Sequence, residues 1–150
     1  MIKYNFILLM LSLSFGGCTT INSFKDSFEK PKFSPSILEH SDYISSAIAD
    51  WIIEEAKSEN TQRIRISNID KSNNFDVINS NIIEKLKSNG LNVTNENNNS
   101  VLSSSYLVSE IDDKILIKIQ TKEQEVSKLF AKGEANSIIP ISPLSVRILK

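Results

Sequence analysis

The stretch KILIKIQT, residues 114–121, places isoleucine at every second position from Ile115 to Ile119. Because successive side chains of a strand point to opposite faces, this spacing predicts a strand with one clearly apolar face. An apolar face has to be covered, so the strand is expected to belong to a sheet that packs against another layer.

Two further strand patterns flank this stretch. Residues 105–110 precede it and residues 125–132 follow it, and both have the length and composition of strands. Asp112 and Asp113 lie in the first connection, where aspartate favours a tight turn. The three segments are therefore predicted to be consecutive antiparallel strands.

The C-terminal residues 138–149 are extended in pattern but contain two prolines. Pro140 and Pro143 have no N–H group to donate, so this segment is predicted to lie at a sheet edge, or in a loop as far as Leu144. Edge strands offer backbone groups to a partner. The candidate contact residues on the last two strand patterns are Val126, Leu129, Phe130, Leu144, Val146 and Ile148. The alternative is that both segments are simply core.

Upstream of the strands the apolar spacing becomes that of helices. From Ser41 onward, one amphipathic stripe recurs every three or four positions: Ile44, Ala47, Ile48, Trp51, Ile52 and Ala56. A second helix is predicted over residues 74–89, with an apolar face made of Phe75, Ile78, Ile82 and Leu86. Gly90 follows where a left-handed residue ends a helix, and Leu91 can fold back on the last turn.

Two short strands complete the pattern. Residues 63–67 read RIRIS, with the two-residue period of a half-buried strand, and residues 91–93 form a short strand after the second helix. The order of helix, strand, helix and several antiparallel strands predicts an α+β domain. We expect two amphipathic helices on one face of a mainly antiparallel sheet of about four to six strands.

The N-terminus has the layout of a bacterial export signal. Lys3 supplies positive charge, residues 6–15 are apolar but too short for a bilayer core of about 30 Å, and the small pair Gly16-Gly17 precedes Cys18. This arrangement resembles the lipobox of bacterial lipoproteins. The resemblance implies cleavage before Cys18 and fatty acyl chains such as palmitate on that residue. The alternatives are an ordinary signal peptide with a chance cysteine, or a buried helix.

Cys18 is the only cysteine, so no intramolecular disulfide can form. Two or more acyl chains would anchor the chain stably, at about 0.8 kcal/mol per buried methylene. Thr19 stands where an aspartate would commonly retain a lipoprotein in the inner membrane. We therefore expect the outer membrane as the location, with the domain facing the periplasm.

The sequence divides into three parts. They are a signal peptide, residues 1–17; Cys18 with a flexible tether, residues 18–40; and a single periplasmic α+β domain, residues 41–150. The tether shows no sustained period. It either packs loosely on the domain or the lipid surface, or orders on a partner, through its three aromatic residues Phe24, Phe28 and Phe33.

The composition gives no support for catalysis or nucleic-acid binding. The net charge is −1, with no Lys/Arg cluster. The lone histidine, His40, is expected to be solvated, which leaves no base for a Ser–His dyad. Metal-ligand clusters and glycine-rich phosphate loops are missing from the sequence. We therefore expect no enzyme, no metal, no cofactor, no small-molecule substrate and no direct nucleic-acid partner.

Ordered segments along the chain are similar to one family. The helix segment at residues 47–52, the strand at 61–66 and the helix end at 86–93 come first, and similar segments follow at 106–108, 126–130 and 139–147. The chain resembles TrbH, a lipoprotein encoded among the mating-pair-formation genes of conjugative plasmids. The resemblance implies a component of a conjugal transfer or type IV secretion apparatus at the outer membrane. It would act by binding other envelope proteins, and the family has no catalytic residues to carry over.

Two other classes fit parts of the pattern. Outer-membrane lipoproteins that regulate a cell-wall synthase also combine a lipid, a tether and a small α/β domain, and they are the main alternative. A carrier of solutes or lipids would need a larger apolar cavity than this short chain is expected to enclose.

Overall fold

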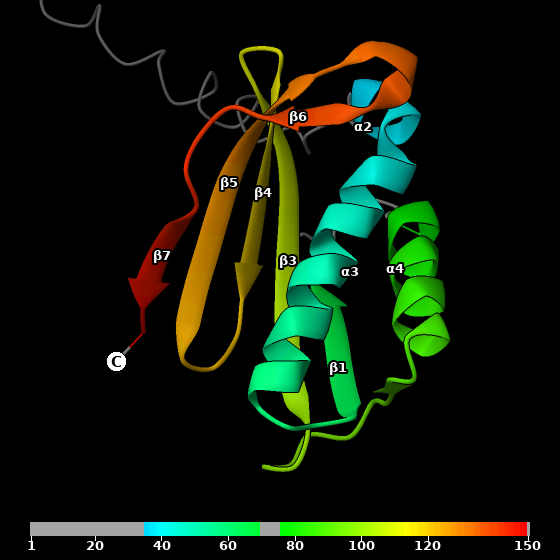
Figure 1. Ribbon diagram of the computed structural model, residues 1–150, viewed down its shortest axis with the longest axis vertical. Coiled ribbons are helices and arrows are strands. Elements are labelled where there is room, and N and C mark those ends of the chain that lie inside the picture. The colour runs from blue at the N-terminus through cyan, green and yellow to red at the C-terminus, as the bar shows by residue number, and fades with distance from the viewer. Residues whose placement is uncertain (1–34, 70–75, 150) are drawn as a thin grey trace, which may run out of the picture. The chain divides into compact units, whose positions relative to one another are not determined.

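The computed structural model describes residues 35–69 and 76–149 of the chain. The predicted signal peptide, Cys18, the three tether phenylalanines and Phe75 lie outside these residues. Figure 1 shows the helices α3 and α4 side by side against one face of a sheet. No helix in the described part of the chain is long and apolar enough to cross a membrane.

The described residues contain three α-helices, and two of them match the predicted pair. They are α2 (Pro35–Glu39), α3 (Ser41–Ser58) and α4 (Asp76–Ser88). The predicted apolar stripes face the sheet, because their residues are fully buried: Ile44, Ile48, Ile52 and Ala56 on α3, and Ile78, Ile82 and Leu86 on α4. Burial of these faces is the main source of stability for both helices.

The strands form one seven-stranded sheet. They are β1 (Arg63–Asn68), β2 (Asn92–Val93), β3 (Leu102–Ile111), β4 (Lys114–Gln120), β5 (Gln124–Lys132), β6 (Ile138–Pro140) and β7 (Ser145–Ile148), with a 3₁₀ turn η1 (Glu134–Asn136) before β6. The order is β2-β1-β3-β4-β5-β6, and β7 also pairs with β5.

The predicted α+β class is confirmed, and the sheet is larger than expected and partly parallel. β1 pairs in parallel with both β2 and β3, whereas all pairings from β3 to β7 are antiparallel. The segment from β1 through α4 to β2 is a βαβ unit, in which a crossover helix joins parallel strands. Alternation of apolar residues predicts the faces of a strand but not the direction of its neighbour.

The tight turn predicted between the first and second long strands is confirmed. Asp112 and Asp113 both have left-handed backbone angles, with φ of 47° and 61°. Ile111 pairs with Lys114 across the turn, so only two residues connect β3 to β4. Such two-residue loops favour Asp because its side chain tolerates the left-handed region.

Residues 35–40 are folded, although the sequence placed them in the tether. Pro35 occupies the first position of α2, where proline is favoured because that N–H has no helical partner. Ile37 is buried in the core. His40 is only 5% exposed and its Nδ1 donates to the Ser36 carbonyl oxygen at 2.8 Å, so the expectation of a solvated histidine was wrong. The ring can be buried because the preceding turn satisfies this hydrogen bond.

Candidate functional site

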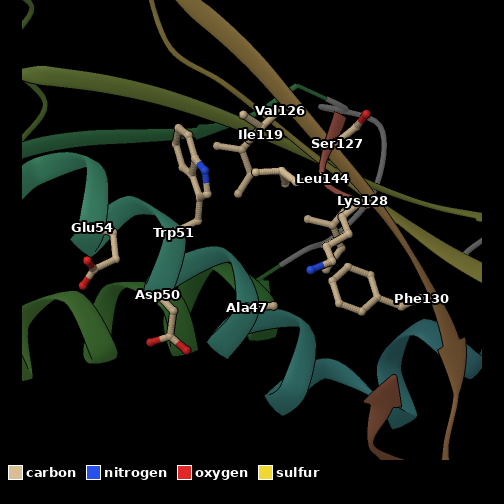
Figure 2. Close-up of a pocket in the computed structure, with 11 residues that line it drawn as sticks. Ala47, Asp50, Trp51, Glu54, Ile119, Val126, Ser127, Lys128, Phe130 and Leu144 are labelled. Carbon is tan, nitrogen blue, oxygen red and sulfur yellow. The ribbon is translucent and has the colours of Figure 1, made fainter. Parts of the chain in front are cut away.

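An open groove lies between α3 and the sheet, with a volume of about 400 Å³. We call it the Trp51 groove. Its lining residues are Ala47, Asp50, Trp51 and Glu54 on α3, Ile117 and Ile119 on β4, Val126, Ser127, Lys128 and Phe130 on β5, and Leu144. Figure 2 shows the indole of Trp51 and the side chains of Ile119 and Leu144 around the same space. The lining is mostly apolar.

α3 contributes one flank of its apolar stripe to the groove. Ala47, Trp51 and Glu54 recur at spacings of four and three residues, so they share one side of the helix. The fully buried row of α3 lies next to them and faces the core. Trp51 is half-buried and packs against that core. The predicted stripe therefore extends beyond the row of residues that is buried in the core, and its outer residues line the groove.

The sheet contributes the same face that the helices cover. Ile119 lies opposite Val126 on β5, and Val126 lies opposite Val146 on β7. Opposed residues of paired strands point to the same face, so an apolar row runs from the core out to β7. Val126 is 3% exposed, whereas Val146 is 52% exposed. The row thus emerges from beneath the helices at the groove.

β5 is not an edge strand, which corrects one of the two predicted contact edges. It pairs with β4 on one side and with β6 and β7 on the other. Val126 and Phe130 are buried, and they form part of the groove lining. Leu129 points to the opposite face of the sheet, because it alternates with its neighbours and lies opposite Leu116. The sequence predicts an edge strand here because it does not show that a later segment of the chain pairs with β5.

The returning segment is one edge strand interrupted in its middle. The Ile141 N–H donates to the Leu129 carbonyl oxygen at 3.0 Å, and the Leu129 N–H donates to Ser142 Oγ at 2.9 Å. A serine side chain thus replaces the backbone acceptor beside Pro143. β6 and β7 lie on either side of this interruption, as the two prolines predict.

The second predicted edge is exposed. Leu144, Val146 and Ile148 have exposed fractions of 48%, 52% and 69%. Leu144 also lines the Trp51 groove, so the groove and the apolar side chains of β7 form one continuous surface. The structure brings Leu144 together with Val126 and Phe130, while Val146 and Ile148 lie beyond the groove. Partner binding at these residues stays a prediction.

Three charged residues line the groove, and two of them have partners. Asp50 forms an ion pair with Lys85 at 2.8 Å, and Glu54 forms one with Lys57 at 2.7 Å. Lys128 has no ion pair within the part of the chain that the structure describes. Its ammonium group points across the groove toward α3 (Figure 2). Among the charged residues of the groove, Lys128 is therefore the one that is free to form an ion pair with a ligand.

Sequence reasoning identified part of this lining and missed Lys128. A lysine within a strand normally indicates a solvated face. The signal that could have found it is its two-residue spacing from Val126 and from Phe130, which places all three on one face. Only the position of α3 shows that this face is half-covered.

The groove offers apolar contact and an ammonium group. Neither histidine nor cysteine occurs among the described residues that line it. In the described ranges, no three His, Cys, Asp or Glu side chains are close enough to hold a metal ion.

The chain was compared with known protein families. The sequence model of the family described as conjugal transfer protein TrbH matches residues 32–148. The matched range includes every helix and strand from α2 to β7. Neither the curated proteins nor the solved structures contain a match to this chain.

Proposed function

Because the chain belongs to the TrbH family of conjugal transfer proteins, we propose that it is a lipid-anchored component of the transfer apparatus that binds another envelope protein through the Trp51 groove. We place the lipid on Cys18 and the domain on the periplasmic side of the outer membrane. The lipobox-like sequence before Cys18 and the identity of Thr19 support this location. The observation that carries the binding proposal is the open apolar groove.

The groove has the composition of an interaction hot spot. Tryptophan is among the residues that most often dominate binding energy when they lie in a partly enclosed apolar setting. Trp51 is half-buried there beside Ile119 and Val126. A partner side chain that fills the space next to the indole would remove apolar surface of both proteins from water.

Lys128 adds a requirement on the partner's charge. It sits among apolar groove residues, and within the described ranges no carboxylate oxygen lies within 4.0 Å of its ammonium group. A partner carboxylate would form a charge-assisted hydrogen bond with it in a partly desolvated place. The proposed ligand is therefore a protein segment with an apolar side chain for Trp51 and an acidic side chain for Lys128.

Co-purification from detergent-solubilised envelopes of transfer-competent cells tests this proposal. The variants are Trp51→Ala and Lys128→Glu, and the control is Lys114→Glu, which makes the same charge change on the opposite face of β4. Loss of a hot-spot side chain costs about 2 kcal/mol or more, so we expect the recovered apparatus partner to fall about 30-fold for Trp51→Ala. Lys128→Glu should weaken recovery and transfer frequency, and Lys114→Glu should change neither.

Thermal melting of each variant separates binding from folding. Trp51 packs against the core, so Trp51→Ala is expected to lower stability as well as binding, whereas Lys128→Glu removes no core contact. Normal recovery and transfer in both groove variants would show that the groove is not the binding site. Recovery of a cell-wall synthase in place of transfer proteins would support the alternative function.

A further inference from the structure

The two edges of the sheet differ in how they are protected. On one edge, β2 is only two residues long. On the other, β6 contains Pro140, and Pro143 precedes β7. Short edge strands and prolines prevent pairing with other chains. β7 is longer than β2 and β6 and contains no proline, so among the described strands it is the edge most open to pairing.

The backbone of β7 presents hydrogen-bonding groups at alternate residues. The Leu149 N–H donates to the Glu123 carbonyl oxygen at 2.8 Å, and Arg147 lies opposite Glu125 in the same register. In an antiparallel pair, only every second residue bonds to the partner strand. Residues 145, 147 and 149 therefore face β5, while the N–H and C=O groups of Val146 and Ile148 point away from it.

The alternation of apolar and polar side chains along β7 and the preceding Leu144 is the same in both chain directions. Residues 144–148 are Leu-Ser-Val-Arg-Ile, so apolar and polar residues alternate symmetrically about Val146. The apolar residues are about half or more exposed on the helix side of the sheet. A contact between two copies about a two-fold axis needs a surface that is complementary to itself, and this pattern meets that requirement.

We propose that β7 of one chain pairs antiparallel with β7 of a second copy, around a two-fold axis at Val146. This register joins the two seven-stranded sheets into one. Val146 then lies opposite its own copy, and Leu144 lies opposite Ile148 of the second chain. The outward-pointing backbone groups of Val146 bond in both directions across the axis.

The single charge of β7 favours this register over the one with its axis at Arg147. With the axis at Val146, Arg147 of each chain lies opposite Ser145 of the other. With the axis one residue later, the two Arg147 side chains would face each other, and directly opposed like charges are destabilising. The charge thus disfavours the register with its axis at Arg147, which would also preserve the backbone pairing.

The two-fold axis has a consequence for the helices. In an antiparallel pairing within one sheet the axis is perpendicular to the sheet, so both copies present α3 and α4 on the same face. Both grooves then open on that face. The dimer rests on β7 and not on the function proposed for the groove, so either proposal can fail alone.

Disulfide trapping of the full chain in detergent tests the contact. In Val146→Cys the two new cysteines lie across the axis, with Cα atoms about 5.5 Å apart, within disulfide range. Ile139→Cys on β6 is the matched control, because Ile139 is 53% exposed and Val146 is 52% exposed. The unaltered chain controls for Cys18. We expect dimer cross-linking at least about tenfold faster for Val146→Cys than for Ile139→Cys.

Light scattering gives an independent measurement. With micelles in excess over protein chains, the unaltered protein should be a dimer and Val146→Lys a monomer with unchanged melting. A monomeric unaltered protein at about 100 μM would overturn the proposal, since a specific dimer contact should be occupied at that concentration. Equal cross-linking of the two cysteine variants, a dimer that persists in Val146→Lys, or trapping of residue 146 on a different protein would also overturn it.

Discussion

Tyr106, on β3, is a fully buried member of the hydrophobic core. Its burial raises the pKa of the Tyr106 hydroxyl far above the ordinary tyrosine value of 10.0, and the nearby charge of Asp76 acts in the same direction. The unfolded chain has no such burial, so it loses this proton at lower pH than the folded chain does. The contribution of Tyr106 to stability is therefore complete below about pH 10 and is lost as the pH rises above that value.

Tyr106→Phe should remove this alkaline dependence. The free energy of unfolding of the unaltered chain should fall above about pH 10, with Tyr106 contributing at most about 1.4 kcal/mol per pH unit. Urea unfolding between about pH 8 and 11 measures the slope. Tyr43→Phe is the control, because Tyr43 is largely exposed. Equal slopes in the two variants would contradict the assignment to Tyr106.

Lys132 also makes the stability fall at alkaline pH, and it does so equally in the Tyr106→Phe and Tyr43→Phe variants. Its hydrogen bond to Glu110 raises the pKa of the Lys132 ammonium group, with a smaller contribution from the charge of Asp113. The stability that this pair supplies is also present at neutral pH and is lost in alkali. Because Lys132 is present in both tyrosine variants, the difference between their slopes still isolates Tyr106.

At the scale of elements, the end of α4 depends on one glycine. Gly90 has φ of +81°, and its N–H donates to the Lys87 carbonyl oxygen at 3.0 Å. The Leu91 N–H donates to the Leu86 carbonyl oxygen at 3.1 Å, which completes a Schellman motif. This ending turns the chain from α4 directly into β2.

Gly90→Ala should destabilise the domain by about 1 kcal/mol, the cost of a left-handed residue with a Cβ atom. No atom lies within 4 Å of the position that the new Cβ would take, so a clash adds nothing. Gly90→Asn should cost less, because asparagine tolerates this conformation. Lys87→Ala, an exposed change in the same turn, controls for helix propensity. Chemical denaturation measures all three, and equal stability of Gly90→Ala and the unaltered chain would contradict the strain argument.

Local pattern predicted the elements better than their pairing. The helix from Ser41, the Gly90 ending and the three long strands follow from residue spacing, and all are present. The parallel pairing of β1 with β3 was not predicted, because spacing carries no information about the direction of a neighbour. For the same reason the sequence predicts β5 as an edge strand, whereas in the structure β6 and β7 return along it.

Sequence alone predicts only those groove residues whose type is uncommon for the helix or strand in which they lie. Trp51 is conspicuous in a helical stripe, and the two prolines mark the interrupted edge that leads to Leu144. Lys128 lies in an ordinary strand context, and its importance depends on α3 covering that face in part. The groove is formed by elements that are far apart in sequence. It can be recognised only once their packing is known, because a local sequence pattern carries no information about packing.

At the scale of the whole molecule, the two proposed contacts share a residue. Leu144 lines the Trp51 groove and also lies at the end of the proposed β7 pairing. Side chains on this face continue from Trp51 through Val126 to Val146, so burial at β7 changes the outer border of the groove. A ligand in the groove and a second copy on β7 are therefore expected to influence each other's affinity, and this coupling must be equal in both directions.

The proposed lipid anchor would determine where these contacts can form, and Cys18→Ser tests it. Cys18 precedes residue 32, where the family match begins, so its replacement should leave the melting of the domain unchanged. We expect Cys18→Ser to leave the outer-membrane fraction, as a soluble or uncleaved chain, and transfer frequency to fall, because the groove is no longer held at its partner. Stable anchoring needs two or more acyl chains. A serine at position 18 would not receive them, because the lipid is expected on the cysteine sulfur.

Thr19→Asp is the matched variant, because it preserves Cys18 and changes only the residue expected to direct sorting. It should remain bound to membranes but move to the inner membrane, and mass spectrometry should find the same acylated N-terminus as in the unaltered chain. Transfer frequency should fall in this variant too, since the domain would be tethered to the wrong bilayer. An unmodified thiol at Cys18, or unchanged membrane partition of Cys18→Ser, would contradict lipid anchoring while leaving the groove and the β7 contact to be judged by their own tests.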